Sequence, residues 1–258
     1  MLTGLRVLVT GASSGIGKSC CVVMSGHGAT VFGTGRNEES LKKMKEDSIL
    51  VDYAVADLTA ENECERVVTA ANGSLGGLTT VVNSAGVLQG GGMDVATLDN
   101  FKYNFGANIQ SVFEIMQHSI PFLKLAVDSS PCIINISSVN AKQAFKGCAT
   151  YCASKAAVDQ LSRCASLDLA PFNIRVNVVN PGVVETPLQK RGGMTDEAYT
   201  SFLDRSINVT HPIGAALNRV AQAEEVGELV SFLSSKNAAF ITGECIAIDG
   251  GRQNLGAR

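Results

Sequence analysis

The chain has 258 residues, of which 45% are hydrophobic and 17% charged, against about 25% charged in an average soluble domain. A chain of this length and hydrophobicity can bury a large core, which excludes a small disulfide scaffold and a disordered protein. Its 21 basic and 24 acidic residues give a net charge of -3 without any basic run, so we expect no nucleic-acid partner.

Short β-branched segments alternate with longer amphipathic segments along the whole chain, a pattern typical of strand, helix, strand units. We predict strands at 5–10, 29–34, 50–56, 79–83, 132–137, 174–180 and 245–248. We predict helices at 15–26, 38–46, 60–72, 98–124, 151–170 and 222–234. The strands are nearly continuously apolar, so helices should cover both faces of the sheet. The predicted fold class is α/β: one Rossmann-type domain over residues 1–258 with a doubly wound, mostly parallel, seven-stranded sheet.

The N-terminus enters a strand-like segment at once, and no apolar stretch approaches the roughly 18 to 20 residues of a membrane-spanning helix. We therefore expect a cytoplasmic protein with no membrane partner. The eight cysteines show no Cys-x-x-Cys spacing, so we expect reduced core thiols and no metal site. The three histidines are far apart in the sequence and are interpreted as structural: His27, His118 and His211.

A glycine-rich turn, Thr10-Gly11-Ala12-Ser13-Ser14-Gly15-Ile16-Gly17, joins the first predicted strand to the first helix. Gly11 permits the tight exit from the strand, Gly15 leaves room for a pyrophosphate, and Gly17 lets the helix pack closely on the sheet. The open amides and the positive dipole end of that helix attract phosphates. The turn therefore predicts a dinucleotide-binding site.

The same turn allows one alternative. Ala12-x-x-x-x-Gly17-Lys18-Ser19 is close to the phosphate loop of nucleoside triphosphatases. Ala12 stands where that motif has its first glycine, and no other apolar strand ends in the aspartate that would hold Mg²⁺. We therefore favour the dinucleotide.

The end of the second strand, Thr34-Gly35-Arg36-Asn37, bears on the choice of cofactor. An acid at this point would bond the ribose hydroxyls of NAD, but none is present. Arg36 offers a charge-assisted fork to a 2′-phosphate instead. We predict NADP(H) in preference to NAD(H), which stays open because Glu38 or Glu39 could neutralise the arginine.

Tyr151 and Lys155 stand four residues apart at the start of a predicted helix, so both side chains project from the same face. A nearby cation stabilises a phenolate, and we expect Lys155 to lower the pKa of Tyr151. Upstream, Ser137 and Ser138 follow an apolar strand. A hydroxyl therefore lies at the carboxyl edge of the sheet, where ligands bind in folds of this class.

Together these motifs resemble the short-chain dehydrogenase/reductase family, over essentially the whole chain. The glycine turn is similar to the cofactor loop of that family. Ser138, Tyr151 and Lys155 have the order and spacing of its catalytic triad, and Asn108 matches its fourth catalytic residue.

Further segments carry the same resemblance. Asp57-Leu58 resembles the pair that contacts adenine, and Asn83-Ser84-Ala85-Gly86 is similar to the Asn-Asn-Ala-Gly signature, with Ser84 in place of the second Asn. Pro181-Gly182 and Thr186 resemble the segment that closes over the nicotinamide, and Asp249-Gly250-Gly251 the C-terminal signature. The candidate cofactor-binding residues are Gly11, Ser13, Ser14, Gly15, Ile16, Gly17, Arg36, Asp57, Leu58, Asn83, Ala85, Gly86, Tyr151, Lys155, Pro181, Gly182, Val184 and Thr186.

The resemblance implies an oxidoreductase that transfers a hydride between NADP(H) and a carbonyl or secondary alcohol of a small to medium organic molecule. Ser138 would hold the substrate oxygen, Tyr151 would exchange its proton, and Lys155 would also bond the nicotinamide ribose. Asn108 would hold a water that passes protons. The family likeness implies a homotetramer built on the helices at 98–124 and 151–170. A non-catalytic dinucleotide sensor or scaffold is the alternative, which the intact catalytic residues disfavour.

Residues 183–215 are expected to form a lid over the substrate, with a short helix after Thr195. We expect an apolar cover from Leu188, Met194, Tyr199, Phe202 and Leu203. Lys190 and Arg191 are also in this segment, so an anionic substrate stays an open alternative. Cys148 and Cys152 flank Tyr151 and are interpreted as core-facing residues, with a redox switch as the alternative.

Overall fold

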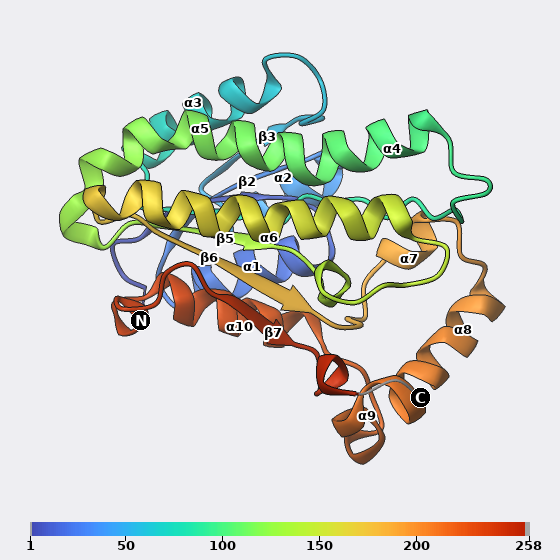
Figure 1. Ribbon diagram of the computed structural model, residues 1–258. Helices are drawn as coiled ribbons and strands as arrows, with labels where there is room; N and C mark the ends of the chain where they lie inside the picture. Colours follow the sequence, from blue (N-terminus) through green and yellow to red (C-terminus); the bar gives the residue numbers. More distant parts are fainter. Residues whose placement is uncertain (1, 256–258) are drawn as a thin grey trace.

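The computed structural model describes residues 2–255, so residues 1 and 256–258 of the predicted domain lie outside it. A seven-stranded sheet of order β3-β2-β1-β4-β5-β6-β7 forms its centre (Figure 1). Each neighbouring pair of strands is parallel. The strands are β1 (Arg6–Thr10), β2 (Thr30–Gly35), β3 (Asp52–Val55), β4 (Thr80–Asn83), β5 (Cys132–Ile136), β6 (Arg175–Pro181) and β7 (Cys245–Ile248). The predicted doubly wound α/β fold is confirmed.

The α-helices are α1 (Gly15–Gly26), α2 (Glu38–Glu46), α3 (Glu63–Leu75), α4 (Leu98–Phe105), α5 (Ser111–Leu123), α6 (Ala149–Leu169), α7 (Leu188–Arg191), α8 (Asp196–Arg205), α9 (Pro212–Leu217) and α10 (Ala223–Ser234). The prediction of one continuous helix at 98–124 is wrong. A π-helical turn at Gly106–Gln110 separates α4 from α5. The hydropathy pattern did not reveal this turn because α4, the π-helical turn and α5 follow one another without a non-helical break.

Helices cover both faces of the sheet because successive side chains of a strand point to opposite sides. Val7 and Val9 of β1 pack in one core with α1, α2 and α10. Leu8 packs in a second core with α3 and α5. In Figure 1, α4, α5 and α6 lie in front of the sheet, with α1 and α10 behind it.

Buried asparagines tie the middle of the sheet to α6. Asn83 Nδ2 of β4 donates to Asn135 Oδ1 of β5 at 2.9 Å. Asn135 Nδ2 in turn donates to Ser162 Oγ of α6 at 2.8 Å. A buried amide without a partner is costly, so this chain of bonds fixes the register of α6 against β5.

The predicted lid segment forms three helices. Thr195 caps α8 by accepting from Ala198 N, which confirms the short helix expected there. The segment continues through a π-helical turn at Ser206–Thr210 into α9. In Figure 1, α8 and α9 project from the body beyond the ends of β6 and β7.

Replacing Gly17 by Ala should lower the stability of the fold. A Cβ on Gly17 would overlap the carbonyl oxygen of Gly11, and this rigid backbone contact cannot yield easily. We expect the free energy of unfolding in urea to fall by about 1–3 kcal/mol, as for other overpacked sites. Gly26→Ala is the matched control on the same helix, because nothing lies within 4 Å of its added Cβ. Equal stability of the two variants would contradict the close loop-to-helix contact.

Candidate active site

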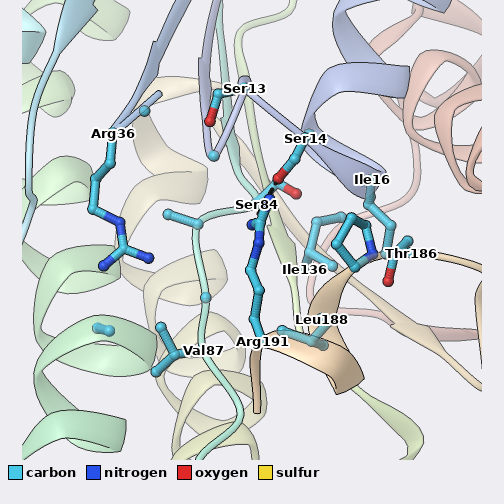
Figure 2. Close-up of a pocket in the computed structure, with 18 of the residues that line it drawn as sticks. Ser13, Ser14, Ile16, Arg36, Ser84, Val87, Ile136, Thr186, Leu188 and Arg191 are labelled. Carbon is cyan, nitrogen blue, oxygen red and sulfur yellow. Dashed lines mark hydrogen bonds between the residues drawn. The ribbon is translucent and has the colours of Figure 1, made fainter. Parts of the chain in front are cut away.

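A cleft of about 660 Å³ runs along the carboxyl ends of the strands. Its walls come from the loops after β1, β2, β3, β4, β5 and β6, together with the start of α6 and α7. The candidate cofactor residues line it, with the exception of Asn83. Figure 2 shows side chains from these separate segments converging on the same space. The sequence therefore brings its motifs together although they lie far apart along the chain.

The glycine turn is bonded directly to the loop after β4. Thr10 Oγ1 accepts from the backbone N–H groups of Ser84 and Ala85, each at 3.1 Å. Gly11 has φ +67°, and an added Cβ would lie 2.9 Å from the backbone of Ala85. The two loops therefore pack backbone against backbone and leave the cleft open beside them.

The first turn of α1 has the features of an anion site in this cleft. Ser14, at its N-cap, makes no side-chain cap, and the turn contains no acidic residue. The leading N–H groups of the helix are therefore free to bond a phosphate. Gly15 lies opposite Thr186, whose side chain would be 3.3 Å from an added Cβ. The narrow glycine-lined space between them fits the pyrophosphate of a dinucleotide.

The far end of the cleft suits an adenosine ribose. Arg36 extends into it, and in Figure 2 its guanidinium meets no other drawn side chain. Asp57 and Leu58 line the same end. The Asp57 carboxylate accepts from the hydroxyl and backbone N–H of Thr59, which, with the smaller effect of Arg36, lowers its pKa. The residues present therefore fit a dinucleotide from its adenosine end to its pyrophosphate.

Ser138, Tyr151 and Lys155 meet at the other end of the cleft. Lys155 Nζ donates to the carbonyl oxygen of Ile136 at 2.9 Å and lies 5.9 Å from the centre of the Tyr151 ring. Two further N–H groups of the ammonium are left for the cleft. An added Cβ on Gly86 would lie 3.5 Å from this nitrogen, so the loop after β4 reaches the same point.

The pKa values of this pair differ from the expectation that Lys155 makes the phenol acidic. Burial raises the pKa of Tyr151 to about 12, and hydrogen bonding from Ser138 offsets part of that rise. Burial lowers the pKa of Lys155 to about 8, against an opposing effect of Asp159. Desolvation is the largest effect on both groups. Tyr151 is therefore a protonated donor and Lys155 mostly an ammonium at neutral pH.

Asn108 does not line the cleft; it lies beneath it, in the π-helical turn. Its Nδ2 donates to Val87 O and Ser154 Oγ, each at 3.0 Å, and its Oδ1 accepts from Val87 N at 2.8 Å. Both amide hydrogens are thus used within the protein. Asn83 is likewise buried and bonded to Asn135, and it does not line the cleft, so its contact with the cofactor stays a prediction.

Sequence reasoning missed several residues that line the cleft. Val87, Tyr103 and Gln189 belong to segments with no local motif, and only their place in the fold brings them to the site. Leu188 and Arg191 also line it; they were expected in the lid but not among the cofactor-binding residues. Of the expected apolar cover, Leu188 alone lines the cleft. Lys190 pairs with Asp196 at 2.6 Å, so this cation is already neutralised within the lid.

Other candidate groups of the sequence lie apart from the cleft. Lys18 of the alternative phosphate loop is exposed and does not line it. Cys148 is buried, which raises the pKa of its thiol and disfavours the reactive thiolate, and Cys152 does not line the cleft either. Within residues 2–255, no group of three or more His, Cys, Asp or Glu side chains is placed to hold a metal ion. No helix in that range is both long and apolar enough to cross a membrane.

Comparison with known proteins assigns this architecture. Residues 11–253 match the family model described as enoyl-(acyl carrier protein) reductase. An L-xylulose reductase of Caenorhabditis elegans is 33% identical, with 98% of this chain and 97% of that protein covered. The chain belongs to the short-chain dehydrogenase/reductase family. Members of the family transfer a hydride with a nicotinamide cofactor, and this chain is an oxidoreductase of that kind.

Further relatives of this short-chain dehydrogenase/reductase agree in length and fold. A cyclopentanol dehydrogenase of Comamonas sp. is 32% identical, with 95% of each chain covered. A solved short-chain dehydrogenase/reductase of unknown function from Caenorhabditis elegans, determined with cofactor, has a TM-score of 0.89 and 30% identity. That match covers 99% of this chain and 97% of the other.

His211 anchors the lid of this short-chain dehydrogenase/reductase. Its Nε2 accepts from Val183 N at 3.0 Å, and its Nδ1 lies 2.9 Å from Ser206 O, to which it donates. Burial lowers the pKa of His211, against an opposing effect of the Ser206 bond and smaller opposite effects of Arg252 and Asp249. Only the neutral ring can accept from Val183, so the structural role expected of His211 agrees with its contacts.

Stability should therefore fall in mild acid. The folded protein holds His211 neutral below its usual pKa of 6.5, so the unfolded chain binds more protons there. We expect the free energy of unfolding to decrease from about pH 6.5 downward, with a slope of at most about 1.4 kcal/mol per pH unit from this residue. His211→Gln can keep both hydrogen bonds without titrating and should flatten the slope between pH 6.5 and 5.5. His118→Gln should not, and an unchanged slope in His211→Gln would contradict the assignment.

Proposed function

We propose that this protein is an NADP(H)-dependent reductase of carbonyl groups, and dehydrogenase of the corresponding secondary alcohols, on small to medium organic molecules. The observation that carries the proposal is the meeting of Ser138, Tyr151 and Lys155 in the same cleft as the first turn of α1. A dinucleotide extended from that turn toward α6 brings its far end to these three side chains. The bound nicotinamide supplies or accepts the hydride.

The chain's own residues move the proton. The Tyr151 phenol is held protonated by its burial, so it is a proton donor at neutral pH. Ser138 Oγ accepts from Asn140 N and can donate its hydrogen to the substrate oxygen, where charge develops. The two donors then stabilise the forming alkoxide, and Tyr151 gives up its proton to it.

Lys155 has two roles in the proposal. Its ammonium, tied to Ile136 O, presents its remaining N–H groups to the cofactor ribose. Its charge also stabilises the tyrosinate left after proton transfer, whereas in the resting state burial is the larger effect on that phenol. Asn108 acts as a positioning residue, because it fixes the backbone of Val87 on the cleft wall and Ser154 of α6. A water bound near Asn108 would have to use its remaining Oδ1 lone pair or its backbone.

Replacing Tyr151 by Phe removes the proton donor and keeps the ring. We expect kcat to fall by about 10²- to 10⁴-fold, with the dissociation constant of NADPH unchanged. NADPH oxidation with a panel of diketones, ketoses, steroids and acyl thioesters identifies a substrate, and the variant is then assayed on it. Tyr53→Phe, on β3 and away from the cleft, is the control. Near-normal turnover by Tyr151→Phe would remove the tyrosine from the reaction.

Arg36 supports the preference for NADP(H). It lies at the adenosine end of the cleft, and within residues 2–255 no carboxylate lies within ion-pair distance of it. The side chain of the neighbouring Asn37 caps α2, where its Oδ1 accepts from Ser40 N, and that oxygen is therefore not bonded to the Arg36 guanidinium. Glu38 also lines this end, and its repulsion of a 2′-phosphate opposes the attraction of Arg36. The proposal gives the attraction of Arg36 the greater weight, so NADP(H) is the preferred cofactor and NAD(H) the weaker one.

Removing the Arg36 charge tests this preference. Arg36→Ala should lower kcat/KM for NADPH by about 10- to 100-fold, the worth of a charge-assisted hydrogen bond, and leave that for NADH nearly unchanged. Lys42→Ala, an exposed cation of α2, is the control. A wild-type protein that prefers NADH, or equal losses for both cofactors, would contradict the assignment.

A sensor that binds the dinucleotide without turnover is the competing function. A sensor needs the phosphate site and the adenosine end, but it has no use for a proton donor beside a hydroxyl and an ammonium. The relatives bear names of sugar and cyclic alcohol enzymes, which favours turnover of a polar or cyclic carbonyl compound by this chain as well. The cytoplasmic location expected from the sequence remains a prediction.

A homotetramer is part of the proposal. The outer faces of α4 and α5 carry exposed aromatic side chains, with Phe101 at 41% and Phe113 at 47% exposure. Phe105, Ile109 and Leu161 line a hollow between them. An apolar patch of this kind on the surface favours contact with a second copy of the same helices.

Placing a charge in this patch tests the assembly. Wild-type protein should sediment at equilibrium with the mass of four chains, and Phe113→Glu with the mass of two or one, because a carboxylate cannot be buried without a partner. Val51→Glu, at an exposed position beside β3, should remain tetrameric. A wild-type monomer would contradict the proposal.

A further inference from the structure

Arg191, the last residue of α7, reaches out of the lid and across the cleft. Its Nη1 donates to Ser14 Oγ at 2.9 Å, although the two residues are 177 positions apart in the sequence. Figure 2 shows the extended side chain meeting Ser14 at the loop that precedes α1. The adjacent Lys190 pairs with Asp196 within the lid. The two cations of α7 thus have different partners, and of the two it is Arg191 that lines the cleft.

The surroundings of this guanidinium are positive. Ser14 is the N-cap of α1, where the uncapped N–H groups of a twelve-residue helix face the cleft without an acidic residue in the first turn. A helix N-terminus carries about half a positive charge, and the guanidinium carries a full one. Within residues 2–255, no carboxylate lies within ion-pair distance of Arg191. The Arg191 guanidinium and the N-terminus of α1 face the same space with only the Ser14 hydroxyl between them, an arrangement that favours a bound anion.

We propose that Arg191 is a ligand of the cofactor pyrophosphate, and that this bond closes α7 over the cleft. The inference rests on the proposed function, which places a dinucleotide in this space. When the cofactor binds, the guanidinium exchanges Ser14 Oγ for phosphate oxygens, so that the anion lies between it and the first turn of α1. The planar fork of an arginine can bond two phosphate oxygens at once.

The position of α7 gives this bond a consequence for the substrate. Leu188 and Gln189, on the same short helix, line the cleft. Gly192, directly after α7, packs on the backbone carbonyl of Leu88 in the loop after β4, where an added Cβ would have no room. A bond that fixes Arg191 therefore also fixes Leu188 and Gln189, which form part of the cleft wall in the lid. The lid is ordered by the cofactor, before the substrate arrives.

Arg191→Ala tests the inference, and Lys190→Ala is the matched control from the neighbouring position. Calorimetric titration gives the dissociation constants of NADPH and NADH. Arg191→Ala should raise both by a similar factor of about 10 to 100, because both cofactors carry the pyrophosphate. Lys190→Ala should change neither by more than about twofold, since exposed ion pairs contribute little. The arginine is exposed, so the melting temperature of Arg191→Ala should equal that of the wild type.

Hydrogen exchange of residues 188–194 supplies the second measurement. Saturating NADPH should slow exchange there in wild type and in Lys190→Ala, and should not in Arg191→Ala. A wild type that binds dinucleotide together with an Arg191→Ala variant of unchanged affinity overturns the inference and leaves the proposed function standing. A selective loss of NADPH over NADH overturns it too, because the contact would then be to the 2′-phosphate. A wild type that binds neither dinucleotide overturns the proposed function and this inference with it.

Discussion

The buried hydrogen bonds between α6 and the end of β5 determine where the reactive groups of this enzyme lie. Lys155 Nζ donates to Ile136 O, and Ser137 Oγ donates to Lys155 O at 3.0 Å. These two bonds run in opposite directions between the same two segments. Any slide or rotation of α6 would leave a buried polar group without a partner. Tyr151, one turn before the lysine, is therefore held beside Ser138, which directly follows that strand end.

Positive groups line the cleft from end to end, and Lys155, which the α6 hydrogen bonds position, is one of them. The chain carries a net charge of -3, yet the cleft receives Arg36 at one end, the first turn of α1 and Arg191 near its middle, and Lys155 at the other end. These positive groups mark a path that suits a molecule with phosphates at its centre. Burial keeps Tyr151 protonated at neutral pH, and although it lowers the pKa of Lys155 to about 8, the lysine is still mostly charged there, so the proton donor is ready when the cofactor binds. A carbonyl reduction needs that combination of states.

Much of this organisation followed from the sequence because it depends on local chemistry. A short stretch of sequence is enough to predict the apolar strands, the glycine turn and the shared helix face of Tyr151 and Lys155, because each follows from local backbone geometry. The π-helical turn has no such local signal; it holds Asn108, which is bonded to Val87 in a distant loop. Arg191 looked like a lid cation facing substrate, and only the fold directs it to Ser14. The pKa of Tyr151 depends on burial, which spacing along a helix does not encode.

A crystal structure of the protein with bound NADP⁺ tests the central claim most directly. The account predicts the pyrophosphate at the first turn of α1, the adenosine ribose beside Arg36, and the nicotinamide end beside Ser138 and Tyr151. A dinucleotide bound in the reverse direction, or outside the cleft at the carboxyl edge of the sheet, would contradict it.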